Sequence, residues 1–535
     1  MPFDWNNPYR TIRSPVMARN IVSTSQPLAS QAGMRMLHQG GNAVDAAIAT
    51  AATMTIVEPV SNGLGSDNFA LVWADGQLHG LNASGVAPAA WNPDYFRRRH
   101  NGAIPERGWD SVTTPGAVAG WVALSERFGR LPFADLLEPA IELAERGHAV
   151  ARIVSEKWAR QVPVLQEQPG FADAFMPRGR GPAPGERFVF AAAGKTLRAI
   201  AETRGEAFYR GEIARALAAH AAAHGGSMTE ADLAGYAPQW VEPIQKDYAG
   251  YTVHEIPPNG QGIAALMALG MLDKLDLAAY PIDSVESQHL QIEAMKLAFA
   301  DTYRWVAQES SMTQVGAADL LSDAYLSERA RLIDPRRASH FHHGTPPRGG
   351  TIYLCTADAG GMMVSLIQSN YMGFGSGVVV PGTGVSLQNR GKGFTLDDGH
   401  PNQVSGGKRP FHTIIPGFLT HGGQPQMAFG VMGGNMQPQG HMQALVRMLT
   451  HRQQPQTACD APRWKVGTGL SVDCEPTMQP ALVQALRDRG HQVEGQDDPY
   501  MDYGAGQFIW RLSDDLEDGY VAASDARRDG HAAGF

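Results

Sequence analysis

The stretch from Pro335 to Ser369 decides the fold and reads PRRASHFHHGTPPRGGTIYLCTADAGGMMVSLIQS. Its first part, 335–350, is basic, polar and rich in proline and glycine, which predicts an exposed, mobile linker. Immediately afterwards Thr351–Thr356 and Met362–Ser369 are β-type runs separated by a glycine-containing turn. A flexible linker that ends at the first residue of a core hairpin is an unusual junction, and it draws attention to Thr351.

The junction suits one kind of chemistry. A threonine hydroxyl is a poor nucleophile without a base, and its own α-amino group can be that base if the threonine is a chain N-terminus. Such an amine has a pKa of about 7.7–8.0 in model peptides, which suits proton transfer near neutral pH. Gly350 has no side chain to hinder attack on its carbonyl. We therefore predict cleavage between Gly350 and Thr351, giving fragments 1–350 and 351–535.

Upstream of the junction, the pattern predicts helices laid on a sheet. A helix is expected to begin at Ser25-Gln26-Pro27 and to stop before Gly40-Gly41. Asn42 is positioned to cap a second helix, Ala43–Val57. Two strands, Asn68–Trp73 and Gln77–Asn82, then surround an Asp-Gly turn.

The middle of the chain, from about Pro115 to Asp334, is mostly helical in pattern. Three helices are expected from this region: Leu137–Arg146, Ile213–Ala223 and Ser287–Val306. A loop rich in proline and glycine at 257–262 interrupts the pattern.

Composition excludes several classes of protein. The 535 residues are 43% hydrophobic and 18% charged, with a net charge of −9 and no basic stripe, so neither nucleic acid nor an anionic membrane is an expected partner. Met1–Arg13 does not have the pattern of a signal peptide, and the most apolar long run, Ala43–Val57, is too short to span a bilayer.

The cysteines and histidines do not predict a metal site. The three cysteines have no metal-type spacing and are interpreted as small buried hydrophobes in a reduced, cytoplasmic setting. The linker histidines are not accompanied by acidic or cysteine partners, so no metal is expected there. These residues are Cys355, Cys459, Cys474, His340, His342 and His343.

Ordered blocks along almost the whole chain resemble the gamma-glutamyltranspeptidase family. The opening block is GGNAVDAAIATAATMTIVEPVSNGLGSDNFALVW, from Gly40 to Trp73. Further matching blocks are Thr114–Gly120, Lys296–Asp301, Phe374–Val378, Pro381–Val385, Lys408–Pro410, Gly433-Gly434 and Ser524–Gly530. The resemblance implies an N-terminal-nucleophile hydrolase. It is an α/β fold built as a four-layer α/β/β/α sandwich, one large domain made of two self-cleaved fragments.

The resemblance also implies roles for individual residues. Thr351 falls on the family's nucleophile, and Ser369 falls on a second hydroxyl residue that contacts it. Gly433 and Gly434 fall on paired glycines whose backbone N–H groups form the oxyanion hole.

The expected substrate-binding positions depart from the family pattern. The family's arginine for the α-carboxylate of the substrate reads Ser84, its serine pair reads His412-Thr413, and an asparagine that holds substrate reads Tyr371. The segment that carries its amine-binding acid reads Asn389-Arg390-Gly391-Lys392-Gly393-Phe394, so the acid becomes Gly393. The stretch 395–407 is also shorter than the family's lid loop, which predicts a more open pocket.

These departures leave two readings of specificity and one alternative to catalysis. Weaker selection for an α-amino group is expected, because an ammonium without a carboxylate partner is costly to bury. Arg390 and Lys392 either grip a carboxylate-ended acyl group or face solvent.

Three hypotheses for the function follow. The first hypothesis is a gamma-glutamyl hydrolase or transferase. The second is an acylase for other acidic acyl amides, of the glutaryl-cephalosporin or oxamate type. The third is an inactive scaffold.

The resemblance also bounds the partners. It implies no cofactor, because maturation and turnover use only protein groups. The expected partners are a small-molecule amide substrate and the two self-derived subunits, and we consider a dimer of processed heterodimers as the assembly.

Overall fold

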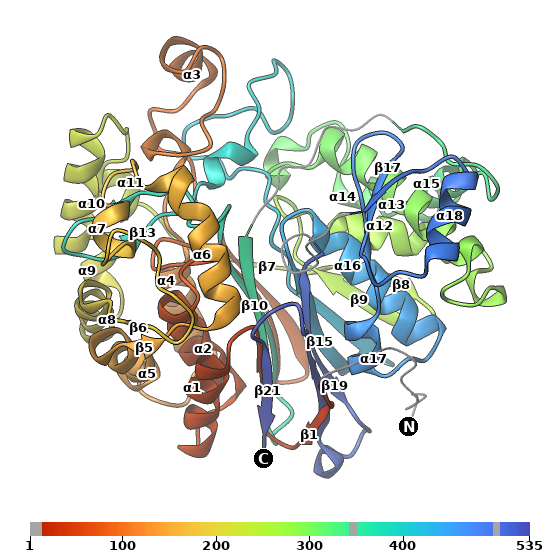
Figure 1. The fold of residues 1–535 in the computed structure, drawn as a ribbon, viewed down its shortest axis with the longest axis horizontal. Helices are drawn as coiled ribbons and strands as arrows, with labels where there is room; N and C mark the ends of the chain where they lie inside the picture. The colour runs from red at the N-terminus through yellow and green to blue at the C-terminus, as the bar shows by residue number, and fades with distance from the viewer. Residues whose placement is uncertain (1–12, 342–349, 496–502) are drawn as a thin grey trace.

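The computed structural model describes residues 13–341, 350–495 and 503–535. Two seven-stranded sheets lie face to face in the centre, and helices cover the outer face of each (Figure 1). The arrangement is the expected four-layer α/β/β/α sandwich.

The first sheet carries the junction at its centre. Its strands, in spatial order, are β21 (His531–Gly534), β2 (Ile21–Thr24), β10 (Gly350–Ala357), β11 (Met363–Tyr371), β3 (Asp67–Ala74), β4 (Gln77–Ala83) and β7 (Gln239–Val241). Strand β10 pairs with β2 on one side and with β11 on the other, both antiparallel. The predicted hairpins β10–β11 and β3–β4 are confirmed.

The second sheet packs against the first through a mostly apolar layer, in which the Ser23 and Ser365 hydroxyls donate to the carbonyls of Ala523 and Phe429 across the interface. Its order is β1 (Val16–Ala18), β20 (Tyr520–Ser524), β19 (Ala505–Arg511), β15 (Gln424–Met432), β14 (Gly417–His421), β9 (Tyr251–Glu255) and β8 (Ile244–Tyr248). The layer between the sheets includes Phe69 and Tyr353 from the first sheet and Phe418 and Ile509 from the second. This closely packed layer keeps the two sheets in a fixed relation, so residues at their common edge keep fixed positions.

Helices from the first 234 residues cover the outer face of the first sheet. They are α1 (Pro27–His38), α2 (Ala43–Val57), α4 (Ala117–Phe128), α5 (Phe133–Arg146), α6 (Arg152–Leu165), α7 (Phe171–Phe175), α8 (Ala191–Thr203), α9 (Glu206–Tyr209), α10 (Glu212–Ala223) and α11 (Glu230–Ala234). Asn42 caps α2 in a reciprocal pair with Asp45, as its position predicts. Every residue of α2 is buried, because the helix lies between the sheet and α1 and α5.

The second sheet is covered by helices from both sides of the junction. These are α12 (Gly262–Leu272), α13 (Val285–Trp305), α14 (Ala317–Leu320), α15 (Asp323–Ala330), α16 (Met436–Leu445), α17 (Pro455–Asp460) and α18 (Pro480–Asp488). Helix α3 (Pro93–Arg99) stands apart at the top in Figure 1. Short strands complete the fold: β5 (His148–Ala149) with β6 (Arg187–Phe188), β12 (Val379–Val380) with β13 (Val385–Ser386), and β16 (Trp464–Val466) with β17 (Ser471–Cys474) and β18 (Gln492–Gly495).

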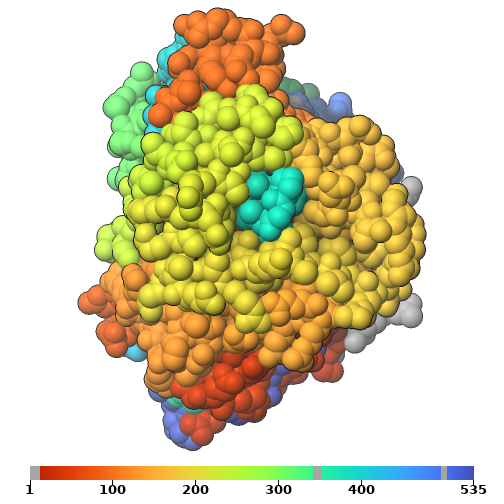
Figure 2. Space-filling view, turned by 90° about the vertical axis from the view of Figure 1, so that its left-hand side faces the viewer, coloured from red at the N-terminus to blue at the C-terminus, as the bar shows by residue number. Residues whose placement is uncertain are grey.

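The segments before and after the junction are interleaved. Figure 2 shows a patch of the later segment (teal) that reaches the surface inside a ring of the earlier one (yellow). There the Val379 N–H donates to the Pro169 carbonyl, and the Thr196 hydroxyl donates to the Thr383 carbonyl. Asp358, in the β10–β11 turn, accepts the Ala43 N–H at the start of α2. In the first sheet, β2 of the earlier segment pairs with β21 and β10, and β3 pairs with β11, so a cut at 350–351 would leave this packing in place.

Three sequence expectations can be checked directly. Cys355, Cys459 and Cys474 are free and buried, as the small-hydrophobe interpretation predicts. Of the predicted linker 335–350, only 335–341 and Gly350 lie within the described residues. There 335–337 and His340 are exposed as predicted, whereas Ala338 is buried and its N–H donates to the Arg489 carbonyl, so the expectation of exposure is wrong for that residue. The rest of the linker, with His342 and His343, lies outside the described residues. In the described part of the chain, no helix has the length and apolarity that crossing a bilayer requires.

Candidate active site

A β-bulge at the junction aims the Thr351 side chain. Gly350 pairs with Tyr371 and Ile352 pairs with Gln368, so Thr351 alone stands opposite both Ser369 and Asn370. Bulges of this kind turn a side chain away from the regular pleat. Here the Thr351 Oγ1 lies 3.1 Å from the Ser369 Oγ. Thr351 is 2% exposed, so the expected openness of the pocket stays a prediction for the processed protein.

Ser369 is surrounded by donors. Its Oγ accepts the Tyr371 N–H at 2.8 Å and lies 3.4 Å from the Arg390 Nη2. With two donors aimed at this oxygen, the serine is well placed to give its own hydrogen to the Thr351 oxygen. Tyr371 has a φ of 78°, in the left-handed region that side chains avoid. The strained backbone at this residue directs its N–H at Ser369.

Arg390 lies inside the site and is fully buried. Its Nη1 donates to the Thr413 Oγ1 at 2.8 Å, and its guanidinium carbon lies 4.2 Å from the centre of the Tyr371 ring. Burial lowers the pKa of Arg390 to about 10, so the side chain is still a cation at neutral pH. Burial also raises the pKa of Tyr371 to about 12, which keeps its ring neutral there. The solvent-facing alternative is therefore wrong for Arg390.

The charge of Arg390 is only loosely balanced. Among the described residues its closest carboxylate is Asp67, whose Oδ2 lies 3.6 Å from the Arg390 Nε, beyond hydrogen-bonding distance. The same Oδ2 lies 2.9 Å from the His412 Nε2, and the other oxygen accepts the Gly85 N–H. The Ile414 N–H points at the His412 Nδ1, so the ring proton lies on Nε2 and is donated to Asp67. Burial, assisted by Arg390, lowers the pKa of His412 to about 4, so this histidine is neutral at pH 7.

Two other predicted substrate-binding residues, Ser84 and Asn389, use their side chains in hydrogen bonds within the protein. The Ser84 hydroxyl donates to the Asn82 side chain and accepts from Asn259, and all three residues are buried. The Asn389 side chain accepts the Met372 N–H and donates to the Glu106 carbonyl.

Lys392 and Gly393, in the same segment as Asn389 and Arg390, do not supply charge to the site. The Lys392 ammonium donates to the Ile104 carbonyl and lies 3.9 Å from Glu106, with its side chain 30% exposed. At Gly393 a Cβ atom would lie only 2.5 Å from the Phe411 carbonyl oxygen, so an acidic side chain does not fit this backbone.

The segment expected to be a short lid packs onto the α3 region. Gly407 and Lys408 exchange backbone hydrogen bonds with Ala87, and Phe394 and Val404 belong to the apolar cluster around Trp91. Asp398 forms an exposed ion pair with Arg97.

The glycine pair forms a turn between β15 and α16. Gly433 and Gly434 have φ angles of 126° and 60°, which only glycine adopts readily. Within the described residues neither N–H donates a hydrogen bond, and helix α16 begins two residues later. Two unused N–H groups beside a helix N-terminus favour an anionic oxygen.

A chain of contacts connects the glycine pair to Thr351. Gln261 donates to the carbonyls of Gly434 and Thr413, Thr413 accepts from Arg390, and Arg390 lies against Ser369. The structure thus brings together Thr351, Ser369, Tyr371, Arg390, Thr413, His412 and Gly434. Sequence reasoning missed Asp67 and Gln261. Asp67 lies inside the quoted opening block, but nothing in the sequence alone connects Gln261 with the site.

An interleaved α/β/β/α sandwich with a threonine at the start of a central strand defines an N-terminal-nucleophile hydrolase. The chain matches the family model described as gamma-glutamyltranspeptidase over residues 29–535, and it belongs to that family.

Three relatives cover nearly the full length. The chain is 36% identical to the glutathione hydrolase-like YwrD proenzyme of Bacillus subtilis, over 98% of this chain and 100% of that protein. It is 35% identical to the oxamate amidohydrolase proenzyme of Klebsiella pneumoniae, over 98% and 99%. The crystal structure of cephalosporin acylase from Bacillus halodurans superposes with a TM-score of 0.94 at 47% identity, covering 99% of each chain. The chain is therefore a hydrolase of this family, and its relatives include proenzymes that are named for different substrates.

Proposed function

We propose that this protein is a self-processing amidohydrolase that removes acyl groups ending in a carboxylate. The observation that carries the proposal is the buried Arg390 guanidinium. It lies between the Ser369 and Thr413 hydroxyls, and its nearest carboxylate is at 3.6 Å. A guanidinium grips a carboxylate through two parallel N–H donors, and Arg390 has donors to spare.

The proposed processing step uses Thr351 on its own peptide. The Thr351 Oγ1 adds to the Gly350 carbonyl carbon, and the C–N bond of that peptide breaks as an ester forms. Water hydrolyses the ester, which leaves a carboxylate on Gly350 and a free α-amino group on Thr351. Ser369, 3.1 Å away, stabilises the attacking oxygen by hydrogen bonding.

Turnover repeats this chemistry on a substrate. The α-amino group takes the proton of the Thr351 hydroxyl, which attacks the substrate carbonyl. The Gly433 and Gly434 N–H groups stabilise the resulting oxyanion, and the amine product leaves with the transferred proton. Water then releases the acid and regenerates Thr351. Arg390 holds the far carboxylate of the acyl group throughout.

A γ-glutamyl amide is the second candidate substrate. It carries a carboxylate that Arg390 can bind, and one relative has glutathione hydrolase in its name. Its α-ammonium needs a partner, however, and Gly393 has no room for a side chain. Asp67 is already engaged with His412 and Gly85. We therefore infer that a glutaryl amide reacts faster than its γ-glutamyl counterpart.

The test begins with the purified protein on a denaturing gel and N-terminal sequencing of both bands. A band that starts TIYLC is expected, and Thr351→Ala is expected to be uncut and inactive. Thr356→Ala is the matched control, because the hydroxyl of this buried threonine on the same strand donates to the Ala43 carbonyl, away from Thr351 and Ser369. It should be cut and active. An active Thr351→Ala protein would remove Thr351 from the mechanism.

Side-by-side rates on glutaryl and γ-glutamyl anilides test the specificity. A 100-fold preference for the γ-glutamyl compound, about 2.7 kcal/mol in transition-state binding, would reverse our assignment.

A further inference from the structure

One buried polar side chain touches both halves of the site and has no part in the steps above. Gln261 ends the loop between β9 and α12 and is 0% exposed. Its Nε2 donates to the Thr413 carbonyl at 2.6 Å and to the Gly434 carbonyl at 3.0 Å. Its backbone N–H donates to the His412 carbonyl at 2.9 Å.

The orientation of this amide is dictated by its partners. If the oxygen and nitrogen were exchanged, the oxygen would face two carbonyl oxygens at hydrogen-bonding distance, which is repulsive. The Oε1 is buried and makes no hydrogen bond in the described part of the chain. A buried acceptor without a partner is unfavourable. The side chain thus keeps this orientation because of the two hydrogen bonds that its Nε2 donates, although its Oε1 acceptor is unused.

Gln261 also sits on a rigid support. It occupies the N-cap position of α12, whose eleven residues are all buried in the layer behind the second sheet. The residues that it contacts are less constrained by their own structure. Gly434 is a left-handed glycine in a turn, and Thr413 lies outside any strand. Glycine has the largest backbone freedom of any residue, so an outside contact is needed to fix its peptides.

The geometry points to Gln261 as a positioning residue for the reaction. By holding the Gly434 carbonyl, Gln261 fixes the turn in which the Gly433 and Gly434 N–H groups point at the developing oxyanion. By holding the Thr413 carbonyl with the same nitrogen, it sets the distance between that oxyanion site and the Thr413–Arg390 contact. This inference rests on the proposed function, because it assigns Gln261 a role in the same acyl-transfer step.

The experiment compares two buried glutamines. Gln261→Met keeps the volume and removes the two donors. Gln443→Met is the matched control, because Gln443 lies on α16, is 4% exposed and makes two hydrogen bonds with the Trp464 backbone. Processed protein of each variant is assayed with a glutaryl anilide, per active site titrated from the anilide burst.

Gln261→Met is expected to lower kcat by about 10- to 100-fold with little change in KM, as for a misplaced catalytic group. Gln443→Met is expected to lower Tm and leave kcat and KM unchanged. Gln261→Glu supplies a second readout, because its carboxylate repels both carbonyls until it is protonated. Its kcat relative to wild type should therefore rise as pH falls.

The outcomes separate the two proposals. Unchanged kcat in Gln261→Met, an equal loss of kcat in Gln443→Met, or a pH-independent loss in Gln261→Glu overturns the positioning role. Wild-type protein that releases no anilide overturns the proposed function, and the role of Gln261 falls with it.

Discussion

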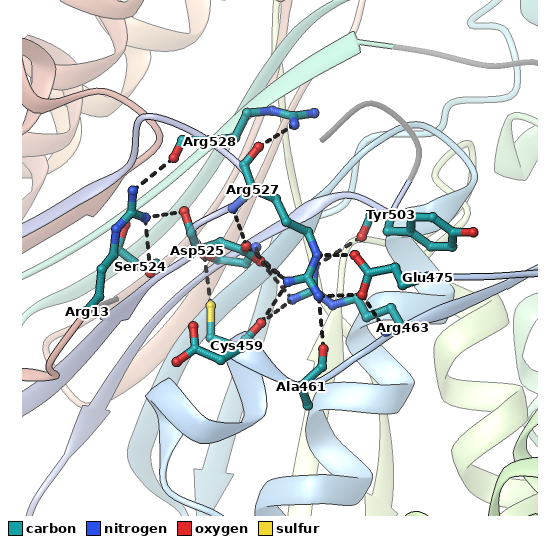
Figure 3. A network of polar contacts seen from close by, with 12 residues as sticks. Arg13, Cys459, Ala461, Arg463, Glu475, Tyr503, Ser524, Asp525, Arg527 and Arg528 are labelled. Atoms are coloured by element: carbon teal, nitrogen blue, oxygen red, sulfur yellow. Dashed lines mark hydrogen bonds and ion pairs between the residues drawn. The ribbon is translucent and has the colours of Figure 1, made fainter. Parts of the chain in front are cut away.

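Two groups of buried charges in this protein are satisfied to very different degrees. Near the C-terminus, Arg463, Glu475, Asp525 and Arg527 form a closed network (Figure 3). Arg527 contacts both Glu475 oxygens at 2.6 Å, and Asp525 at 3.1 and 3.2 Å. Beside Thr351, Arg390 has its nearest carboxylate at 3.6 Å.

The two groups also differ in their hydrogen bonds with the backbone. In the network, the Arg463 and Gly506 N–H groups donate to Glu475 and Asp525, and Arg527 also donates to the Cys459 and Ala461 carbonyls. At the site, the guanidinium meets hydroxyl groups and an aromatic ring. A fully paired buried network holds a structure together, whereas an under-paired cation keeps binding capacity for a ligand.

The largest effect is expected from breaking the C-terminal network. Arg527→Met leaves Glu475 and Asp525 without their main cation, so the free energy of unfolding should fall by about 3–5 kcal/mol. Urea unfolding measures the change. Arg19→Met, which removes the exposed Arg19–Glu517 pair, is the control and should cost less than about 1 kcal/mol. If both variants lose the same stability, the network does not have the structural role assigned here.

Removing the site cation should affect activity more than stability. Arg390→Met should lower kcat/KM for a glutaryl anilide about 100-fold, or about 2.7 kcal/mol. Its loss of unfolding free energy should be smaller than that of Arg527→Met, because Asp67 keeps His412 and the Gly85 N–H. A butyryl anilide, which has no carboxylate, is the matched substrate. An equal loss of kcat/KM with the butyryl anilide would show that Arg390 does not bind the acyl carboxylate.

The smallest effect is a difference between the two groups in their response to acid. His412 has a pKa lowered from 6.5 to about 4 by burial, so the unfolded state binds its proton first and stability falls as the pH drops from about 6.5 to 4. Burial raises the pKa of Asp525, but Arg527 and Arg463 outweigh it and hold that pKa well below the ordinary 3.8. The stability contributed by Asp525 is therefore present above about pH 4 and is lost below it.

Urea unfolding between pH 4 and 8 covers the His412 window and stays above the Asp525 window. His412→Asn should show a shallower decline than wild type between pH 6.5 and 4, by at most about 1.4 kcal/mol per pH unit. Parallel curves for the two proteins would contradict the assignment of a neutral His412.

Much of the fold could be read from local patterns. The cap at Asn42, the β3–β4 hairpin and the β10–β11 hairpin each follow from a few neighbouring residues, and the structure confirms them. Helix ends moved by a few residues: the helix expected at Ser287–Val306 spans Val285–Trp305. Such shifts arise because capping depends on hydrogen bonds that the pattern does not show.

The site was predictable only in part, for a physical reason. The glycine–threonine junction, the hydroxyl at Ser369 and the glycine pair are visible in the sequence because they stand in recognisable blocks. The partner of each substrate-binding residue was not visible in the sequence, because contacts such as Ser84 with Asn259 or Arg390 with Thr413 join distant segments.

The sequence by itself determined local helices and hairpins, and its ordered motifs resembled a family whose layered fold and cleavage junction it therefore predicted. Periodicity, linker composition and motif order are properties of neighbouring residues. Only the tertiary structure decided that Thr351 faces Ser369, that Arg390 turns inward while Lys392 turns away, and that Gln261 reaches the glycine turn. A bulge, the packing of two sheets and a loop 173 residues away along the chain set those directions. They depend on where backbones meet in space, which no local pattern encodes.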